Sequence, residues 1–183
     1  MSDVQHAASC LLSGGVIAHA TEGVWGFACD PNSDSAIERI LEIKGREADK
    51  GMLLLAGSAT VFEPALNRVS LEVRQRVIDS WPGHITWLLP GEAYPVLIRG
   101  SHRTVACRVP DHEQARHICS AFGNAIVSTS LNRTGGSPIV EFSDALRQFE
   151  GDVDFIVPGQ TSGYLGPSQI RGLDGSMIRS ALT

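Results

Sequence analysis

Short apolar runs of four to six residues alternate along the chain with segments in which apolar residues recur every three or four positions. The runs predict β-strands, and the spaced positions predict amphipathic helices. The predicted strands cover 16–20, 24–29, 52–56, 85–89, 104–109, 125–128 and 153–157. The predicted helices cover 3–13, 35–44, 70–80, 111–122 and 143–149. Asp174-Gly175 predicts a turn between two further short strands within 168–179.

The starts of two helices are predicted from capping residues. Ser35 and Glu38 have the spacing of a capping box, and so do Asp111 and Gln114. Glycines mark the ends of both helices, and the first is followed by the charged loop 45–51. We therefore expect Ser35 and Asp111 to be the N-cap residues.

Strands and helices alternate irregularly, which favours an α+β (mixed α/β) fold, in which helices pack on one mixed sheet, over a strictly doubly wound fold. The 183 residues suffice for one substantial core, so we expect a single domain over 1–183. No apolar run approaches the roughly 18 residues of a membrane span, and the first residues lack the pattern of a signal peptide. The sequence thus predicts a single-domain protein with no membrane segment.

The charge balance is acidic, with 15 Lys and Arg against 20 Asp and Glu, a net charge of −5. A general nucleic-acid binder would show a basic excess, so this class is disfavoured. Thirteen of the fifteen basic residues are Arg, leaving only Lys44 and Lys50 as lysines. Arginine suits bidentate binding of carboxylates and phosphates. A GC-rich genome would produce the same bias, and both explanations stay open.

The four cysteines, Cys10, Cys29, Cys107 and Cys119, sit among apolar neighbours, and no pair has CxxC spacing. This pattern predicts buried free thiols, with neither a zinc ribbon nor a thioredoxin motif. The six histidines are scattered along the chain. We therefore expect no metal site built from protein ligands.

Polar residues gather where apolar segments end. Lys44 and Arg46 flank a glycine, an arrangement that suits a polyphosphate but also an ordinary solvated helix end. Arg108 closes an apolar strand and needs an anion there, either a ligand or an internal carboxylate. The hydroxyl-rich run 128–132 can bind a ribose or phosphate, or form a simple turn. Together these residues indicate a cleft that binds an anionic small molecule.

Six motifs recur in the order typical of the YrdC-like family, which the chain resembles over nearly its whole length. The segments that carry the resemblance are Thr21-Glu22-Gly23-Val24-Trp25-Gly26-Phe27, Lys44-Gly45-Arg46, Trp81-Pro82-Gly83-His84-Ile85-Thr86, Arg108-Val109-Pro110, Ser128-Thr129-Ser130-Leu131-Asn132 and Pro167-Ser168-Gln169-Ile170-Arg171. The resemblance implies a twisted mixed sheet flanked by helices with a concave cleft, the fold shared by YrdC and DHBP-synthase-like proteins. It also implies synthesis of threonylcarbamoyl-adenylate and pyrophosphate from L-threonine, bicarbonate or CO2, and ATP, for the t6A37 modification of tRNA.

The resemblance further implies two groups of binding residues. Threonine would be held by Thr21, Arg108, Ser128 and Ser168, with Arg108 on its carboxylate. ATP would be held by Lys44, Arg46, Thr104, Ser130, Asn132 and Arg179, with the first two on the phosphates. No residue stands out as a general base, which fits catalysis by positioning. Mg²⁺ would arrive with ATP, without a protein cage.

The resemblance implies two kinds of partner, the t6A transferase proteins that take the adenylate and an RNA. It also implies that the protein works in the cytoplasm. Two other classes stay open from the residues. One is an RNA-binding module that uses an arginine-lined cleft without catalysis. The other is carbamoyl transfer, because YrdC-like modules also occur in larger carbamoyltransferases.

Several positions depart from the family pattern. Ala20 and His84 replace prolines, Gly23 replaces a residue with a side chain, and Leu131 replaces an alanine. We expect Gly23 to add flexibility and Leu131 to crowd the base or ribose of ATP. All the charged motif positions are kept, which favours an intact reaction with altered affinity.

Overall fold

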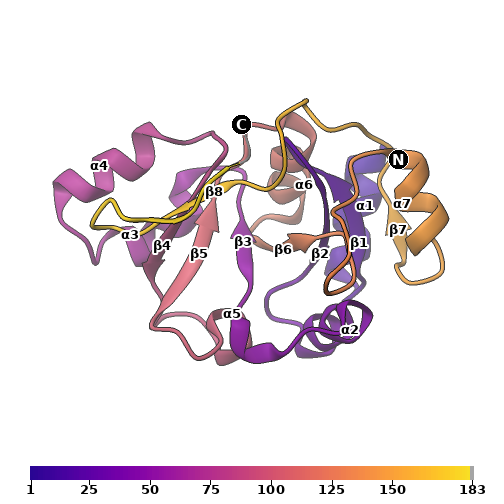
Figure 1. The fold of residues 1–183 in the computed structure, drawn as a ribbon, viewed down its shortest axis with the longest axis horizontal. Helices are drawn as coiled ribbons and strands as arrows, with labels where there is room; N and C mark the ends of the chain where they lie inside the picture. Colours follow the sequence, from indigo (N-terminus) through magenta and orange to yellow (C-terminus); the bar gives the residue numbers. More distant parts are fainter. Residues whose placement is uncertain (182–183) are drawn as a thin grey trace.

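A nine-stranded mixed sheet organises residues 1–181, the part of the chain that the computed structural model describes (Figure 1). Its strands are β1 (Ile17–Ala20), β2 (Trp25–Cys29), β3 (Leu53–Leu55), β4 (Ile85–Pro90), β5 (Thr104–Arg108), β6 (Ile126–Ser130), β7 (Phe155–Ile156), β8 (Gln169–Arg171) and β9 (Met177–Arg179). The order across the sheet is β7-β1-β2-β6-β3-β5-β4-β8-β9. The pairs β1–β7, β3–β5 and β4–β8 are parallel and the other neighbours antiparallel, so the predicted mixed sheet is confirmed.

The five predicted helices all form, and short ones appear between them. The α-helices are α1 (Asp3–Leu12), α2 (Asp34–Lys44), α3 (Glu63–Leu66), α4 (Leu71–Asp79), α5 (Val96–Arg99), α6 (Glu113–Phe122) and α7 (Phe142–Phe149). Two 3₁₀ turns, η1 (Ala48–Lys50) and η2 (Ala59–Phe62), complete the list. The sequence missed α3, α5 and both 3₁₀ turns because three or four residues are too few to show a helical repeat.

Both predictions of the N-cap residues were wrong. Helix α2 is capped by Ser33, whose side chain accepts a hydrogen bond from Ala36 N. Helix α6 is capped by His112, whose Nδ1 accepts from Ala115 N. The backbone N–H of Asp111 instead donates to the carboxylate of Glu22, 89 residues earlier in the chain. A tertiary partner therefore overrides the local capping signal at this helix.

The two faces of the sheet are covered differently. On one face, α2, α3, α4 and α7 pack over the strands in a continuous apolar layer that includes Phe27, Leu54 and Trp87. On the other face, α1 and α6 pack side by side over β1, β2, β3 and β6, where Ile17 and Leu55 lie. Side chains alternate between the faces along each strand. The rest of this second face is left without a helix and holds the cavity described below.

The predicted cysteine environment is confirmed for Cys29, Cys107 and Cys119, which are buried free thiols, while Cys10 is half-buried. Burial raises the pKa of Cys29 and Cys119 to about 12, so both stay as neutral thiols at pH 7. None of the helices within residues 1–181 combines the length and the hydropathy needed to cross a bilayer.

Candidate active site

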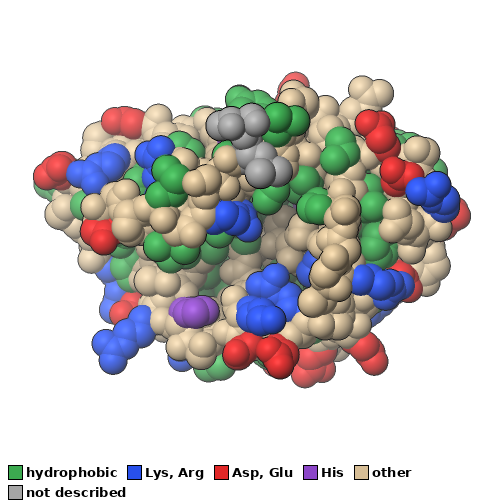
Figure 2. All heavy atoms as spheres, in the orientation of Figure 1, with side chains coloured by type: hydrophobic (Ala, Val, Ile, Leu, Met, Phe, Trp, Pro, Cys, Tyr) green, Lys and Arg blue, Asp and Glu red, His purple; other side chains and the backbone are tan. Residues whose placement is uncertain are grey.

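The uncovered part of the sheet forms the floor of a cavity of about 390 Å³, within the size range of small-molecule sites. Its floor comes from β2, β3, β4, β5, β6 and β8, and its walls come from segments 21–24, 46–52, 98–102 and 167–168 and from β9. The space-filling view shows a hollow on this face with Lys and Arg side chains around it (Figure 2). Among the residues that line it, all within the described part of the chain, none is Asp or Glu. The cavity therefore suits an anionic ligand.

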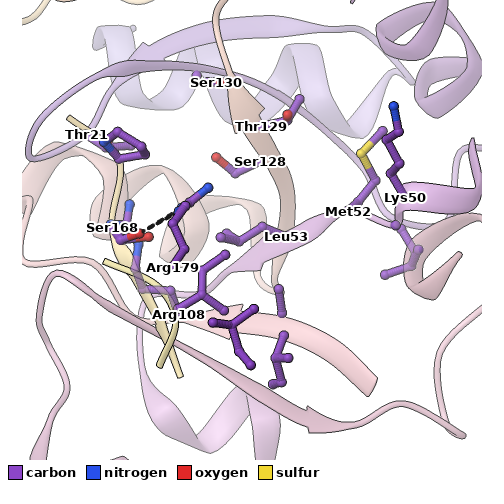
Figure 3. Close-up of a pocket in the computed structure, with 18 of the residues that line it drawn as sticks. Thr21, Lys50, Met52, Leu53, Arg108, Ser128, Thr129, Ser130, Ser168 and Arg179 are labelled. Atoms are coloured by element: carbon purple, nitrogen blue, oxygen red, sulfur yellow. Dashed lines mark hydrogen bonds between the residues drawn. The ribbon is translucent and has the colours of Figure 1, made fainter. Parts of the chain in front are cut away.

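Eight of the ten residues expected to bind threonine or ATP line this one cavity. They are Thr21, Arg46, Thr104, Arg108, Ser128, Ser130, Ser168 and Arg179. The close-up shows that Thr21 and Ser168 lie at one end of the cavity and Lys50 and Met52 at the other (Figure 3). We call the first the inner end and define it by Thr21, Arg108, Ser128 and Ser168. We call the second the rim and define it by Arg46, Lys50, Arg99 and His102.

Hydrogen bonds fix two of the three hydroxyl groups of the inner end, those of Thr21 and Ser168. Thr21 Oγ1 donates to the carbonyl oxygen of Val24 at 2.6 Å, within its own loop. Ser168 Oγ and Thr86 Oγ1 share a hydrogen bond of 2.8 Å, and both residues are buried. Thr86 ends the Trp-Pro-Gly-His-Ile-Thr motif, so that motif acts on the site by holding Ser168. These hydroxyl groups are held in place by the protein before any ligand binds.

Arg108 lies beneath the inner end and is paired with Glu22. Arg108 Nη2 is 3.1 Å from Glu22 Oε2, and the two side chains are 5% and 0% exposed. Of the two alternatives for the anion of Arg108, the internal carboxylate is therefore present. Burial lowers the pKa of Arg108, although Glu22 acts in the opposite direction. Arg108 Nε is buried without a hydrogen-bond partner in residues 1–181, which leaves the guanidinium able to bind a second anion.

Arg179 extends over the inner end from β9. Its Nε and Nη2 donate to the carbonyl oxygen of Ser168 at 3.2 and 2.8 Å (Figure 3). Burial lowers the pKa of Arg179, and the positive charges of Arg108 and Arg46 lower it further. Three guanidinium groups thus act on the same cavity, where their field favours an anion.

The rim is formed by loops and short helical turns rather than by strands. Arg46 Nη2 donates to the carbonyl oxygen of Gly51 at 2.9 Å, which ties together the two ends of loop 45–51. Burial lowers the pKa of Arg46, and the charge of Asp49 partly offsets this. Lys50 is exposed and lies 3.7 Å from Glu47 in a weak surface ion pair. The rim cations can therefore reorient when a ligand enters.

Lys44 and Asn132 are the two expected ATP-binding residues that do not line the cavity. Lys44 is 4% exposed, and its Nζ donates to the carbonyl oxygens of Ser130 and Asn132 and to Asn132 Oδ1. Burial and the charge of Arg46 lower the pKa of Lys44 to about 8. In this structure Lys44 holds the end of β6, where Ser130 lies, and the start of the loop that follows it, and a direct phosphate contact stays a prediction.

The sequence reasoning missed other residues that line the cavity beside the motif residues, among them Lys50, Met52, Arg99 and His102. Arg99 ends the short helix α5 and His102 follows it, and this helix carried no detectable pattern. Gly100 lies so close to loop 45–51 that a Cβ there would be 2.2 Å from the carbonyl oxygen of Asp49. The only hint in the sequence was Gly100 next to the basic Arg99. Which loop this glycine approaches is shown only by the tertiary structure.

The two expectations drawn from Gly23 and Leu131 were wrong. A Cβ on Gly23 would lie 2.1 Å from the carbonyl oxygen of Gly166, so this glycine permits close backbone packing and does not add flexibility. Leu131 is 0% exposed within the apolar layer on the opposite face of the sheet and does not line the cavity. It therefore does not crowd a ligand. His84 packs its ring against Tyr164, with the ring centroids 4.9 Å apart.

Comparison with known proteins gives the family of the chain. A family model for Sua5, YciO and YrdC proteins, described as "Telomere recombination", matches residues 9–181. The chain belongs to the Sua5/YciO/YrdC family. A relative named threonylcarbamoyl-AMP synthase, from Nitrosococcus oceani, is 42% identical over 178 residues, which cover 96% of each chain.

Solved structures of this family have the same fold as the chain. P. abyssi Sua5 complexed with L-threonine matches with a TM-score of 0.89 and 27% identity, covering 97% of this chain and 54% of that one. E. coli YciO matches with a TM-score of 0.81 and 25% identity, covering 98% of this chain and 89% of that one. The chain therefore spans only about half the length of P. abyssi Sua5. The predicted twisted mixed sheet flanked by helices is confirmed.

Proposed function

We propose that the chain synthesises threonylcarbamoyl-adenylate, releasing pyrophosphate, from L-threonine, bicarbonate or CO2, and ATP. The observation that carries the proposal is the convergence of Thr21, Arg46, Arg108 and Ser168, from distant segments, on one cavity lined by cations. The relatives named threonylcarbamoyl-AMP synthase and the threonine-bound P. abyssi structure support it. The product would serve the t6A37 modification of tRNA in the cytoplasm, passed on by t6A transferase proteins.

L-Threonine occupies the inner end in this proposal. Its carboxylate binds the guanidinium of Arg108, whose Nε has a free donor, and the hydroxyls of Thr21, Ser128 and Ser168 surround the rest of the amino acid. A charge-assisted pair with a buried arginine gives both affinity and orientation. Glu22 remains beside Arg108, so the bound carboxylate and Glu22 share the same cation.

ATP occupies the rest of the cavity, with its phosphates toward Arg46 and the other rim cations. Arg179 lies between the two substrates in this proposal. It donates a hydrogen bond to Ser168 at the inner end, and it is close enough to Arg46 at the rim for that charge to lower its pKa. Ser130 and Thr104 offer hydroxyls from the sheet floor to the nucleoside. Asn132 joins this site through its hydrogen bond with Ser130.

The reaction needs positioning and charge neutralisation more than acid–base groups. The threonine amine, as the free base, attacks the carbon of CO2 and gives a proton to the solvent, or it attacks bicarbonate, whose hydroxyl group leaves with the amine proton as water. Either route gives a carbamate. A carbamate oxygen then attacks the α-phosphorus, and the bond from that phosphorus to the bridging oxygen breaks to release pyrophosphate. The guanidinium groups of Arg46 and Arg179 stabilise the charge on the phosphates.

Mg²⁺ enters with ATP in this proposal. No group of three or more His, Cys, Asp or Glu side chains in residues 1–181 is placed to hold a metal ion, and the cavity lining offers no carboxylate. These residues fit a Mg²⁺ ion that is held by the phosphates themselves.

Pyrophosphate release measures the proposed reaction directly. The purified chain should release pyrophosphate from ATP only when both L-threonine and bicarbonate are present, and omission of either should reduce release to the background. In isothermal titration, ATP should bind both with and without threonine, as expected for two substrates that occupy separate sites within one cavity. Folded protein that releases no pyrophosphate with all three substrates would contradict the proposal.

An RNA contact is a second proposal that the cationic rim supports, although the net charge of −5 opposes general binding. Binding of tRNA that weakens with salt and is unchanged by ATP and threonine would favour an RNA site apart from the cavity. Competition between tRNA and ATP would place the RNA on the rim.

A further inference from the structure

His19 is a fully buried polar residue next to the inner end that the proposed mechanism does not use. It lies on β1 directly opposite Gly26 of β2, and Gly26 in turn lies opposite Ser130 of β6. Residues directly opposite each other in a sheet project from the same face. The imidazole of His19 therefore projects from the cavity face, beside a glycine that lines the cavity and leaves that position without a side chain.

The hydrogen bonds of His19 define which nitrogen carries its proton. His19 Nδ1 is 3.0 Å from the carbonyl oxygen of Ala20, which can only accept, so Nδ1 carries the hydrogen. Burial lowers the pKa of His19 to about 4; the Ala20 carbonyl opposes this, and His112 and Arg108 add to it. The ring is therefore neutral at pH 7, and Nε2 presents a lone pair. Nε2 is buried and has no hydrogen-bond partner within residues 1–181.

Ser128 is the hydroxyl placed to use this lone pair. A Cβ built on Gly26 would lie 3.2 Å from Ser128 Oγ and 3.9 Å from His19 Nε2, so both polar atoms border the space that Gly26 leaves open. Ser128 is buried, lines the cavity and makes no side-chain hydrogen bond within residues 1–181. A change of its χ1 rotamer moves the hydroxyl between staggered positions at low energetic cost.

We propose that His19 is a positioning residue of the amino-acid subsite. Its Nε2 accepts a hydrogen bond from the Ser128 hydroxyl, and this orients the lone pairs of Ser128 Oγ toward the ammonium group of the bound amino acid. The charges of the cavity explain why an oriented acceptor is needed. An amino acid carries an ammonium group, but the lining provides cations and no carboxylate to receive it. A hydroxyl group that donates its single hydrogen bond to His19 can only accept a hydrogen bond from the ligand.

This proposal rests on the proposed function, because it needs an amino acid at the inner end. It is tested with His19→Asn, which lacks the Nε2 acceptor, and His19→Gln, whose amide oxygen can take the place of Nε2. His19→Asn should raise both the Kd and the KM for L-threonine about tenfold, as expected for the loss of one hydrogen bond. The KM for ATP should not change, and His19→Gln should stay close to the wild type.

A double-mutant cycle distinguishes action through Ser128 from a merely structural role. In a Ser128→Ala background, His19→Asn should cause no further loss of threonine affinity, because the hydroxyl through which it acts is gone. A loss that is equal in both backgrounds would overturn the proposal. The loss should also be the same for L-threonine and L-2-aminobutyrate, which lacks the hydroxyl; a loss seen only with L-threonine would contradict the assignment to the ammonium group.

A measurement on the unaltered chain covers the case in which the variants fail to fold. The ¹⁵N resonance of His19 Nε2 should have the shift of an unprotonated nitrogen and should move when L-threonine is added. A protonated Nε2, or a resonance unchanged at saturating L-threonine, would overturn the proposal. The two proposals fail separately: absence of threonine binding by the wild type contradicts the proposed function, whereas normal binding by a folded His19→Asn variant contradicts only the role of His19.

Discussion

The two ends of the cavity are built in opposite ways. The four residues of the inner end are at most 7% exposed and stand on strands or in loops that are hydrogen-bonded to strands. The rim residues are half-buried or exposed and stand on loops and the short helix α5. The inner end therefore keeps its shape without a ligand, whereas the rim can change shape around one. This difference suits a small, rigid amino acid inside and a long, flexible triphosphate outside.

The difference between the two ends also predicts which substitutions change stability as well as ligand binding and which change ligand binding alone. A residue of the inner end participates in the core, so a substitution there should change both the free energy of unfolding and the affinity for threonine. A residue of the rim has few packing contacts to lose, so a substitution should change ATP binding alone. The following variants test this separation, beginning with the largest expected effect on stability.

Arg108→Met should destabilise the fold most, by about 3–5 kcal/mol, because it leaves the Glu22 carboxylate buried without its cation. Urea denaturation measures this loss as a fall in the free energy of unfolding. The matched control is the double variant Glu22→Gln/Arg108→Met, in which neither buried charge of the pair remains. It should recover part of the stability and none of the threonine affinity. Equal stability of the single and double variants would show that Glu22 is not paired in solution.

Lys44→Ala should have an intermediate effect. The sequence predicts weaker ATP binding with an intact fold, and the structure adds a loss of about 1.5–3 kcal/mol, since Nζ donates to Ser130 and Asn132. Both quantities are measured on the same preparation, by urea denaturation and by titration with ATP. Unchanged ATP affinity would remove Lys44 from the ATP site and leave it a purely structural role.

Lys50→Ala should change stability by no more than about 0.5 kcal/mol, because Lys50 is exposed and its ion pair with Glu47 is weak. Its KM for ATP should rise, and the difference from the wild type should shrink at high salt. The matched control is Arg147→Ala on α7, which removes another exposed ion pair, to Asp144, and does not line the cavity. An equal effect of both variants on the KM for ATP would contradict a specific role of the rim.

Much of this architecture was predictable from local patterns. The apolar runs located the strands because buried strands in this sheet are apolar on both faces, as in β2. The motif residues located the cavity because polar residues at the ends of buried strands need polar partners or a ligand. The failures occurred where a distant segment decides the local structure. Glu22 binds Asp111 N and so moves the start of α6, and Gly166 explains why residue 23 is a glycine.

The sequence by itself determined the family, the mixed sheet and which residue types converge on the site, because these depend on hydrophobic periodicity and on motifs in order. The tertiary structure alone decided how each charge is used. It paired Arg108 with Glu22, turned Lys44 away from the cavity lining and left His19 Nε2 unpartnered beside Gly26. The physical reason is that a charge or a lone pair acquires its role from what lies within a few ångströms, and strand pairing across the sheet sets those neighbours.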